Sequence, residues 1–228
     1  MIQPDLVRLS PNRSASIWLG WRAVMIHSTR SGIPGNDDWM STLYWFSNPA
    51  SGVSSHWLVG RDGRRARIVM DNRPAQHAGE HNPYTIGIEL EQPTIDTPFT
   101  AEQLESAAEL VRAYCADYMI PAEHILGLRN GQHGIIGHDE SEQGREVGKS
   151  DPGPLFPWPS FMAMVRGEEE AMTAEERAEL EALRRDVAEQ QQWREVVAPL
   201  IDGLSAALGL LQVTHTGHRH SQRGKPPL

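Results

Sequence analysis

Two histidines and one aspartate in this sequence could together bind a metal ion. His27 ends a short apolar run, residues 21–27, that suits a buried strand, and His138 ends a second such run. Asp151 lies further along, in a loop rich in glycine and proline. Two imidazoles and one carboxylate give three protein ligands and leave a fourth position for water, which is the arrangement of a catalytic zinc site. Zinc in such a site lowers the pKa of its bound water to about 7.

Each of these residues alone is weak evidence for a metal site. The chain contains 10 histidines, and a single histidine at the end of a strand is more often structural than a ligand. His215, His218 and His220 in the C-terminal tail could also bind metal adventitiously. The single cysteine, Cys115, falls on the apolar face of a predicted helix, so we interpret it as a core residue. Residue types and spacing alone leave the zinc hypothesis open.

A lysine stands beside the candidate ligand Asp151. Lysine and arginine together number 21, and the lysines among them are Lys149 and Lys225. A chain that otherwise uses arginine thus places Lys149 two residues before Asp151. A solvated surface lysine is the alternative interpretation, and it does not explain this placement.

The strands that would position these residues can be predicted from periodicity. Residues 85–91 alternate apolar and polar side chains, which predicts a half-buried strand with one polar face. Residues 54–70 predict two strands joined by a turn at Asp62-Gly63. Residues 134–138 predict a further short strand. Strands and helices alternate along the chain, which predicts an α/β fold with a mixed central β-sheet flanked by helices.

Three helices are predicted around this sheet. The first covers residues 36–48, with Asn36 or Asp37 as its N-cap. The second covers residues 99–118, with Thr100 as N-cap, Gln103 completing a capping box and Phe99 packed on Leu104 as a hydrophobic staple. A closing helix is predicted to begin near Pro159.

The composition changes after Gly167. Residues 168–212 are charged and helix-favouring and then apolar, with leucine, isoleucine and valine at spacings of three and four. We expect a C-terminal helical extension of coiled-coil type that self-associates or packs on the core. Residues 213–228 are polar and are expected to be a disordered tail. The predicted organisation is a domain of residues 1–167, the extension and the tail.

Composition excludes several classes of protein. The net charge of −9 argues against a nucleic-acid-binding protein. One cysteine allows no intramolecular disulfide. The polar N-terminus predicts no secretory signal, and no apolar run reaches the roughly 18 residues of a membrane span.

Four segments, taken in order, resemble the zinc-dependent N-acetylmuramoyl-L-alanine amidases of the type 2 family, which share their fold with peptidoglycan-recognition proteins. They are "VMIH" (24–27), "VSSHWLVGRDG" (53–63), "QHAGEHNPYTIGIELE" (76–91) and "GHDE…GKSDPGPLFPW" (137–158). The resemblance covers roughly residues 23–165, and the last segment is the most specific. It implies a type 2 amidase fold that binds one zinc ion through His27, His138 and Asp151.

The resemblance also implies the roles of three further residues. Glu89 matches the family's catalytic glutamate and Lys149 its catalytic lysine, which would stabilise the oxyanion formed during amide hydrolysis. His77 matches a position that lines the substrate groove. Some phage members place a catalytic tyrosine before the hairpin histidine, but here Ser55 precedes His56, so the acid/base role is assigned to Glu89.

The activity implied by the resemblance is hydrolysis of the amide between N-acetylmuramic acid and L-alanine in peptidoglycan. The predicted absence of a signal suits both a cytoplasmic recycling amidase and a phage endolysin that is made in the host cytoplasm and released to the wall by a holin. The helical extension and the tail favour the endolysin. One alternative is a cytoplasmic recycling amidase that acts on soluble muropeptides. The other is a non-catalytic peptidoglycan-recognition module, which the complete set of ligand and catalytic residues disfavours.

Overall fold

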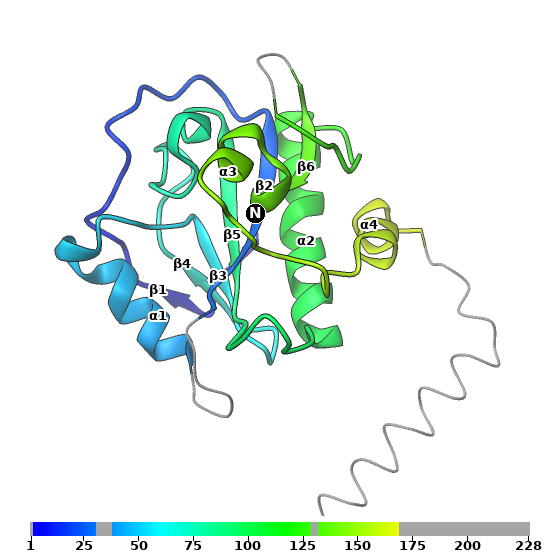
Figure 1. Cartoon of the computed structure of the whole chain (residues 1–228), viewed down its shortest axis with the longest axis horizontal. Helices are drawn as coiled ribbons and strands as arrows, with labels where there is room; N and C mark the ends of the chain where they lie inside the picture. The colour runs from blue at the N-terminus through cyan, green and yellow to red at the C-terminus, as the bar shows by residue number, and fades with distance from the viewer. Residues whose placement is uncertain (1, 31–37, 129–131, 169–228) are drawn as a thin grey trace, which may run out of the picture. The chain divides into compact units, whose positions relative to one another are not determined.

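A computed structural model describes residues 2–30, 38–128 and 132–168 of the chain (Figure 1). The predicted N-cap at Asn36 or Asp37 lies outside these residues, as do the tail and all of the predicted extension except Glu168. The predicted self-association through that extension therefore stays a prediction. Within the described part, no helix is long and apolar enough to cross a membrane.

The central feature is a six-stranded mixed sheet with the strand order β1-β4-β3-β5-β2-β6. Its three neighbouring strands β5, β2 and β6 are parallel, and β3 is parallel to β5 but antiparallel to β4. This arrangement confirms the predicted mixed sheet. The strands are β1 (Leu6–Val7), β2 (Ala23–Ser28), β3 (Trp57–Val59), β4 (Arg65–Arg67), β5 (Thr85–Leu90) and β6 (Gly134–Gly137).

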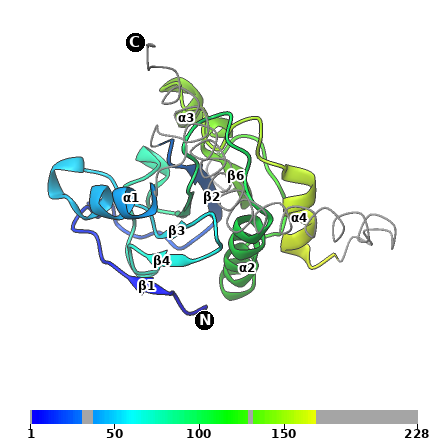
Figure 2. The same ribbon diagram turned by 90° about the horizontal axis from the view of Figure 1, so that it is seen from below.

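Helices cover both faces of the sheet, and Figure 2 shows α2 and α4 on one side and α1 on the other. The α2 side holds the larger apolar cluster, where Val24 and Ile26 of β2 meet Leu104 and Val111 of α2. On the other side, Trp39 and other α1 residues pack on β3 and β4. The helices are α1 (Asp38–Ser47), α2 (Ala101–Tyr118), α3 (Glu142–Glu146) and α4 (Trp158–Arg166), with short 3₁₀ turns η1 (Pro49–Ser51), η2 (Gly79–His81) and η3 (His138–Glu140).

The local signals at α2 are largely as predicted. Thr100 is the N-cap, and its hydroxyl accepts a hydrogen bond from the backbone N–H of Gln103 at 3.2 Å. The Gln103 side chain does not complete the capping box, because its amide instead donates to the carbonyl oxygens of Val59 and Glu91. It thereby fastens α2 to the ends of β3 and β5. Cys115 packs against the core, and burial raises the pKa of its thiol to about 11, as expected for a core residue.

Two predictions about strands are wrong or incomplete. The strand β5 is not half exposed, because α2 covers its Ile86 and Ile88 face and other parts of the chain cover the face of Gly87. Alternation in this strand separates an apolar core face from a buried polar face, and the polar face lines the functional site. The short strand β1 was not predicted, since two residues carry no detectable periodicity.

Candidate active site

The site lies where the parallel strands β2, β5 and β6 end. The register places His27 of β2 beside Glu89 of β5, and Ile26 beside Gly137 of β6. His138 directly follows Gly137 and begins η3. Because the carboxyl ends of neighbouring parallel strands meet at one edge of a sheet, this register brings the three side chains together.

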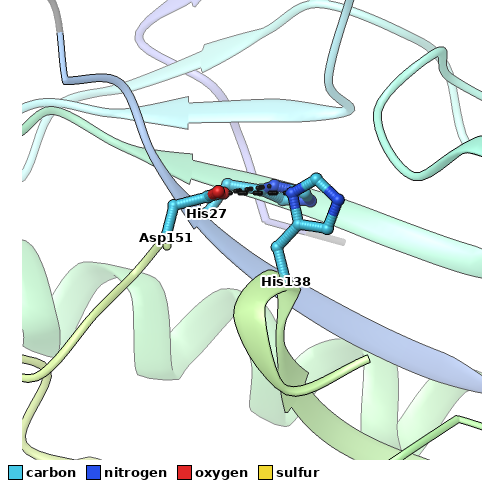
Figure 3. Close-up of side chains that lie close together, drawn as sticks. All are labelled: His27, His138 and Asp151. Atoms are coloured by element: carbon cyan, nitrogen blue, oxygen red, sulfur yellow. Dashed lines mark hydrogen bonds and ion pairs between the residues drawn. The ribbon is translucent and has the colours of Figure 1, made fainter. Parts of the chain in front are cut away.

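His27, His138 and Asp151 converge at this edge, as Figure 3 shows. Asp151 Oδ2 lies 3.0 Å from His27 Nδ1 and 3.2 Å from His138 Nδ1. The potential ligand atoms of the three residues all lie within 4.8 Å of one another. Both histidines are buried. The structure therefore assembles the predicted ligand set from a strand, a 3₁₀ turn and a loop.

This donor set fits a zinc ion. Zn–N and Zn–O bonds of about 2.0–2.1 Å in a tetrahedral site put neighbouring ligand atoms about 3.3 Å apart, close to the two separations from Asp151 Oδ2. One carboxylate oxygen faces two imidazole nitrogens, so a cation bound among them would replace the protons that these contacts otherwise need. Burial would raise the pKa of Asp151, but the hydrogen bonds from His138 and His27 outweigh it and hold that pKa well below its ordinary value.

His77 determines which nitrogen of His27 faces the ligand cluster. His77 Nε2 lies 3.2 Å from the carbonyl oxygen of Thr85, which can only accept, so Nε2 carries the hydrogen. Burial first, and then the neighbouring charges of His27 and His56, lower the pKa of His77 well below its ordinary value. Its Nδ1 is therefore an acceptor for His27 Nε2–H at 2.9 Å. When a cation replaces the proton between His27 Nδ1 and Asp151, this assignment leaves the Nδ1 lone pair of His27 directed at the cation.

Gly87 makes room for this arrangement. A Cβ atom at position 87 would lie 2.7 Å from Nδ1 of His77, which is closer than side chains tolerate. The glycine of the "IGIE" segment thus lets the His77 ring lie over β5. Sequence reasoning assigned His77 to the substrate groove, and the structure adds a direct contact with the predicted ligand His27.

Glu89 is half-buried beside His27 and has an unusual pKa. Burial chiefly, together with the negative charge of Asp151, raises the pKa of the Glu89 carboxyl to about 8, while the charge of Lys149 opposes the shift. A bound metal cation would act in the same direction as Lys149 and favour the ionised carboxylate. Perturbed carboxyl groups in clefts are typical of catalytic acids and bases.

A cavity of about 560 Å³ contains all six residues singled out by the sequence. Lys149 and Glu89 line it together with the three candidate ligands and His77. Sequence reasoning missed the remaining wall, which comes from α1, the end of β2, the segment before β3 and the segment between β4 and η2. These residues are Ser28, Thr29, Arg30, Ser41, Thr42, Trp45, Phe46, Val53, Ser54 and Gln76. No sequence signal separated Trp45 from the other apolar residues of α1, of which Met40 and Tyr44 are also exposed in the structure.

Ser55 and His56, which directly precede β3, have structural roles. The Ser55 hydroxyl is buried and lies 2.8 Å from the carbonyl oxygen of Gly87. His56 accepts a hydrogen bond from the Gly87 N–H at Nδ1 and donates from Nε2 to the Arg73 carbonyl oxygen. Neither residue lines the cavity, so the position of the phage-type tyrosine holds a group that fastens β3 to β5.

A family model described as N-acetylmuramoyl-L-alanine amidase matches residues 18–154. The chain belongs to this amidase family. It is 28% identical over 160 residues to N-acetylmuramoyl-L-alanine amidase A of Achromobacter lyticus, covering 64% of this chain and 83% of that protein. It is 35% identical over 121 residues to 1,6-anhydro-N-acetylmuramyl-L-alanine amidase AmpD of Salmonella typhimurium, covering 50% of this chain and 57% of AmpD. The chain thus spans little more than half the length of the AmpD relative.

Solved structures agree with the family assignment. A selenomethionine derivative of AmpD superposes with a TM-score of 0.54 at 25% identity, covering 72% of this chain and 96% of that one. The hydrolase AmiA of Staphylococcus aureus has a TM-score of 0.53 at 14% identity, covering 72% of this chain and 83% of AmiA, and shows likeness of fold alone. The amidase fold predicted from the four sequence segments is confirmed.

Proposed function

We propose that this protein is a zinc-dependent hydrolase of the amide bond between N-acetylmuramic acid and L-alanine in peptidoglycan. The observation that carries the proposal is the convergence of His27, His138 and Asp151 in one cavity with Glu89 and Lys149. The Achromobacter lyticus relative, which this chain matches over 83% of its length, is named for the same activity.

The proposed chemistry divides among the residues of the cavity. A bound zinc ion would supply Lewis acidity and make a water molecule easier to deprotonate. Glu89 accepts a proton from that water as the oxygen attacks the amide carbonyl carbon. Lys149 stabilises the negative charge that develops on the former carbonyl oxygen. Glu89 then gives the proton to the amine of L-alanine as the carbon–nitrogen bond breaks, so the products are a muramyl carboxylate and a free peptide amine.

The experiment measures metal content and product chemistry together. Purified protein should contain one zinc per chain and should release peptides with a new L-alanine amine from peptidoglycan, as identified by mass spectrometry. Chelation should abolish this release, and His27→Ala, His138→Ala and Asp151→Ala should each reduce both bound zinc and activity. Full activity in protein shown to be free of metal would contradict the proposal, and new reducing sugar ends would identify a glycosidase instead.

Two biological roles are compatible with this activity. The helical extension predicted for residues 168–212 favours a phage endolysin that is released from the host cytoplasm by a holin and degrades intact wall. The AmpD relative of Salmonella typhimurium, 35% identical over 121 residues and named as a 1,6-anhydro-N-acetylmuramyl-L-alanine amidase, favours a recycling amidase. Parallel assays on intact sacculi and on a soluble anhydromuropeptide separate these roles. An endolysin should cleave sacculi efficiently, whereas a recycling amidase should prefer the soluble fragment by a large factor in kcat/KM.

A further inference from the structure

The Arg30 guanidinium contacts the loop that carries Asp151 and Lys149. Its Nη2 atom donates to the carbonyl oxygen of Ser150 at 2.7 Å and to that of Pro152 at 3.0 Å. These two carbonyls belong to the residues on either side of Asp151. One nitrogen of Arg30 therefore bridges the backbone around the third candidate ligand.

The other end of the same guanidinium is fixed to the sheet. Arg30 Nε donates to Gln92 Oε1 at 2.8 Å and lies 3.0 Å from the hydroxyl of Ser28. Gln92 is fully buried, and its own amide donates to the Thr97 carbonyl oxygen at 2.8 Å. The anchor is thus a buried, hydrogen-bonded side chain just beyond β5, next to the strand end that carries Glu89.

Two further features indicate that the position of Arg30 is specific. Its backbone has a φ of 49°, in the left-handed region that residues with a Cβ atom adopt uncommonly. Such a conformation persists when surrounding contacts stabilise it. In addition, a Cβ atom at position 153 would lie 2.6 Å from Arg30 Nη2, so Gly153 leaves the space that the guanidinium fills.

Two backbone hydrogen bonds also hold the loop near these positions. The backbone N–H of Lys149 donates to the carbonyl oxygen of Gly144, and the Asp151 carbonyl oxygen accepts from the N–H of Asp139. Those bonds connect the loop to α3 and η3. The bonds from Arg30 connect it to β2 and β5, which carry His27 and Glu89.

We propose that Arg30 is a positioning residue that joins the Asp151 loop to the strands bearing His27 and Glu89 and thereby sets the affinity for the metal. The inference rests on the proposed zinc site, but it concerns a residue that is not one of the candidate metal ligands. Groups that orient metal ligands typically contribute roughly 10–100-fold in metal affinity. A lysine cannot replace Arg30, because its ammonium lacks the planar fork that reaches the loop and the anchor at once.

The test measures the zinc dissociation constant of full-length, metal-stripped protein by competition with a chromogenic chelator. Arg30→Ala should bind zinc roughly 10–100-fold more weakly than wild type, and Arg30→Lys should recover only a small part of this loss. Millimolar ethylguanidine should restore part of the affinity of Arg30→Ala. Circular dichroism melts of the metal-free proteins establish that each variant folds. If Arg30→Ala does not fold, Arg30→Lys, which keeps the charge, takes its place in the affinity measurement.

Arg112 provides the matched control. Its guanidinium also donates to two backbone carbonyl oxygens, those of Met164 and Val165, but it connects α2 to α4 away from the cavity. Arg112→Ala should lower the melting temperature and leave zinc affinity and the ethylguanidine response unchanged. Equal zinc affinity in wild type and both Arg30 variants would overturn the role of Arg30, and so would an equal loss in Arg112→Ala. Wild-type protein that binds no zinc would instead overturn the proposed function.

Discussion

The imidazoles of His27 and His77 meet edge to face, with His27 Nε2 2.9 Å from His77 Nδ1 and the ring planes 80° apart. The Thr85 carbonyl oxygen fixes the hydrogen of His77 on Nε2, so His77 can only accept from His27. A histidine that orients a ligand histidine is expected to affect metal binding before it affects substrate binding. The "HAG" segment (residues 77–79) therefore has two interpretations. His77 either orients the candidate ligand His27 or lines the substrate groove.

Replacing His77 tests these interpretations. His77→Leu removes the Nδ1 atom that accepts a hydrogen bond from His27. The tautomer and the ring orientation of His27 are then no longer fixed, so zinc affinity should fall roughly 10–100-fold. Chelator competition gives the affinity, and steady-state kinetics at saturating zinc give KM. His124→Leu, which removes a partly buried contact with Trp158 and Glu140 outside the cavity, is the control and should leave zinc affinity intact. A raised KM with unchanged zinc affinity would favour the groove-lining role instead.

Glu89 should be required for turnover and not for metal binding. Glu89→Gln keeps the size of the side chain and removes the proton acceptor, so kcat should fall at least about 100-fold while bound zinc stays at one per chain. The kinetics need a soluble muropeptide, with zinc measured on the same preparation. Glu91→Gln is the matched control, because Glu91 lies two residues further along, is buried and does not line the cavity. Near wild-type turnover in Glu89→Gln would show that another group is the base.

Lys149 should act on the transition state. Lys149→Ala removes the cation near the developing oxyanion, so kcat should fall roughly 100-fold with little change in KM. Lys149→Arg keeps the charge and should retain part of the activity. Arg145→Ala removes an exposed cation from α3 outside the cavity and should change kcat little. A loss confined to KM in Lys149→Ala would mean that this lysine binds the ground-state substrate.

The sequence predicted the strands that carry the site more fully than the contacts within it. His27 and His138 could be placed at strand ends because apolar runs stop there. Asp151 lies 124 positions from His27 in the chain, so residue types alone left their shared metal site open, and the family resemblance made that prediction specific. The bridging role of Arg30 could not be predicted, since it depends on two carbonyl groups whose directions are set by the folded loop.

The misassignment of β5 has a related cause. Alternation of polar and apolar residues identifies two faces of a strand but does not say what covers each face. On β5, α2 covers the apolar side, and the His77 ring lies against Gly87 on the other. A buried catalytic edge and a solvent-exposed face give the same sequence pattern, so long-range packing had to decide between them.

The buried His56 makes the stability of the fold depend on pH. Its two ring nitrogens are both used by backbone groups of Gly87 and Arg73, and burial chiefly lowers the pKa of His56 to about 3. In the unfolded chain the pKa of histidine is about 6.5. Between these pH values the unfolded state binds a proton on His56 and the folded state does not. The free energy of unfolding therefore falls as the pH falls from about 6.5 towards 3.

Urea unfolding at pH 7, 6, 5 and 4, with chelator present, should show this loss in wild type. His56→Gln should be less stable at pH 7 by about 1–3 kcal/mol, because one buried backbone group loses its partner. Its stability should nevertheless fall less steeply with acid, by up to about 1.4 kcal/mol per pH unit, which is the contribution of one proton. The other buried histidines, including His27 and His77, titrate in both proteins, so the difference between the two slopes reports His56 together with its electrostatic coupling to His77 and His27. Parallel curves of unfolding free energy against pH for wild type and His56→Gln would show that the buried, neutral His56 is not the cause of the loss of stability in acid.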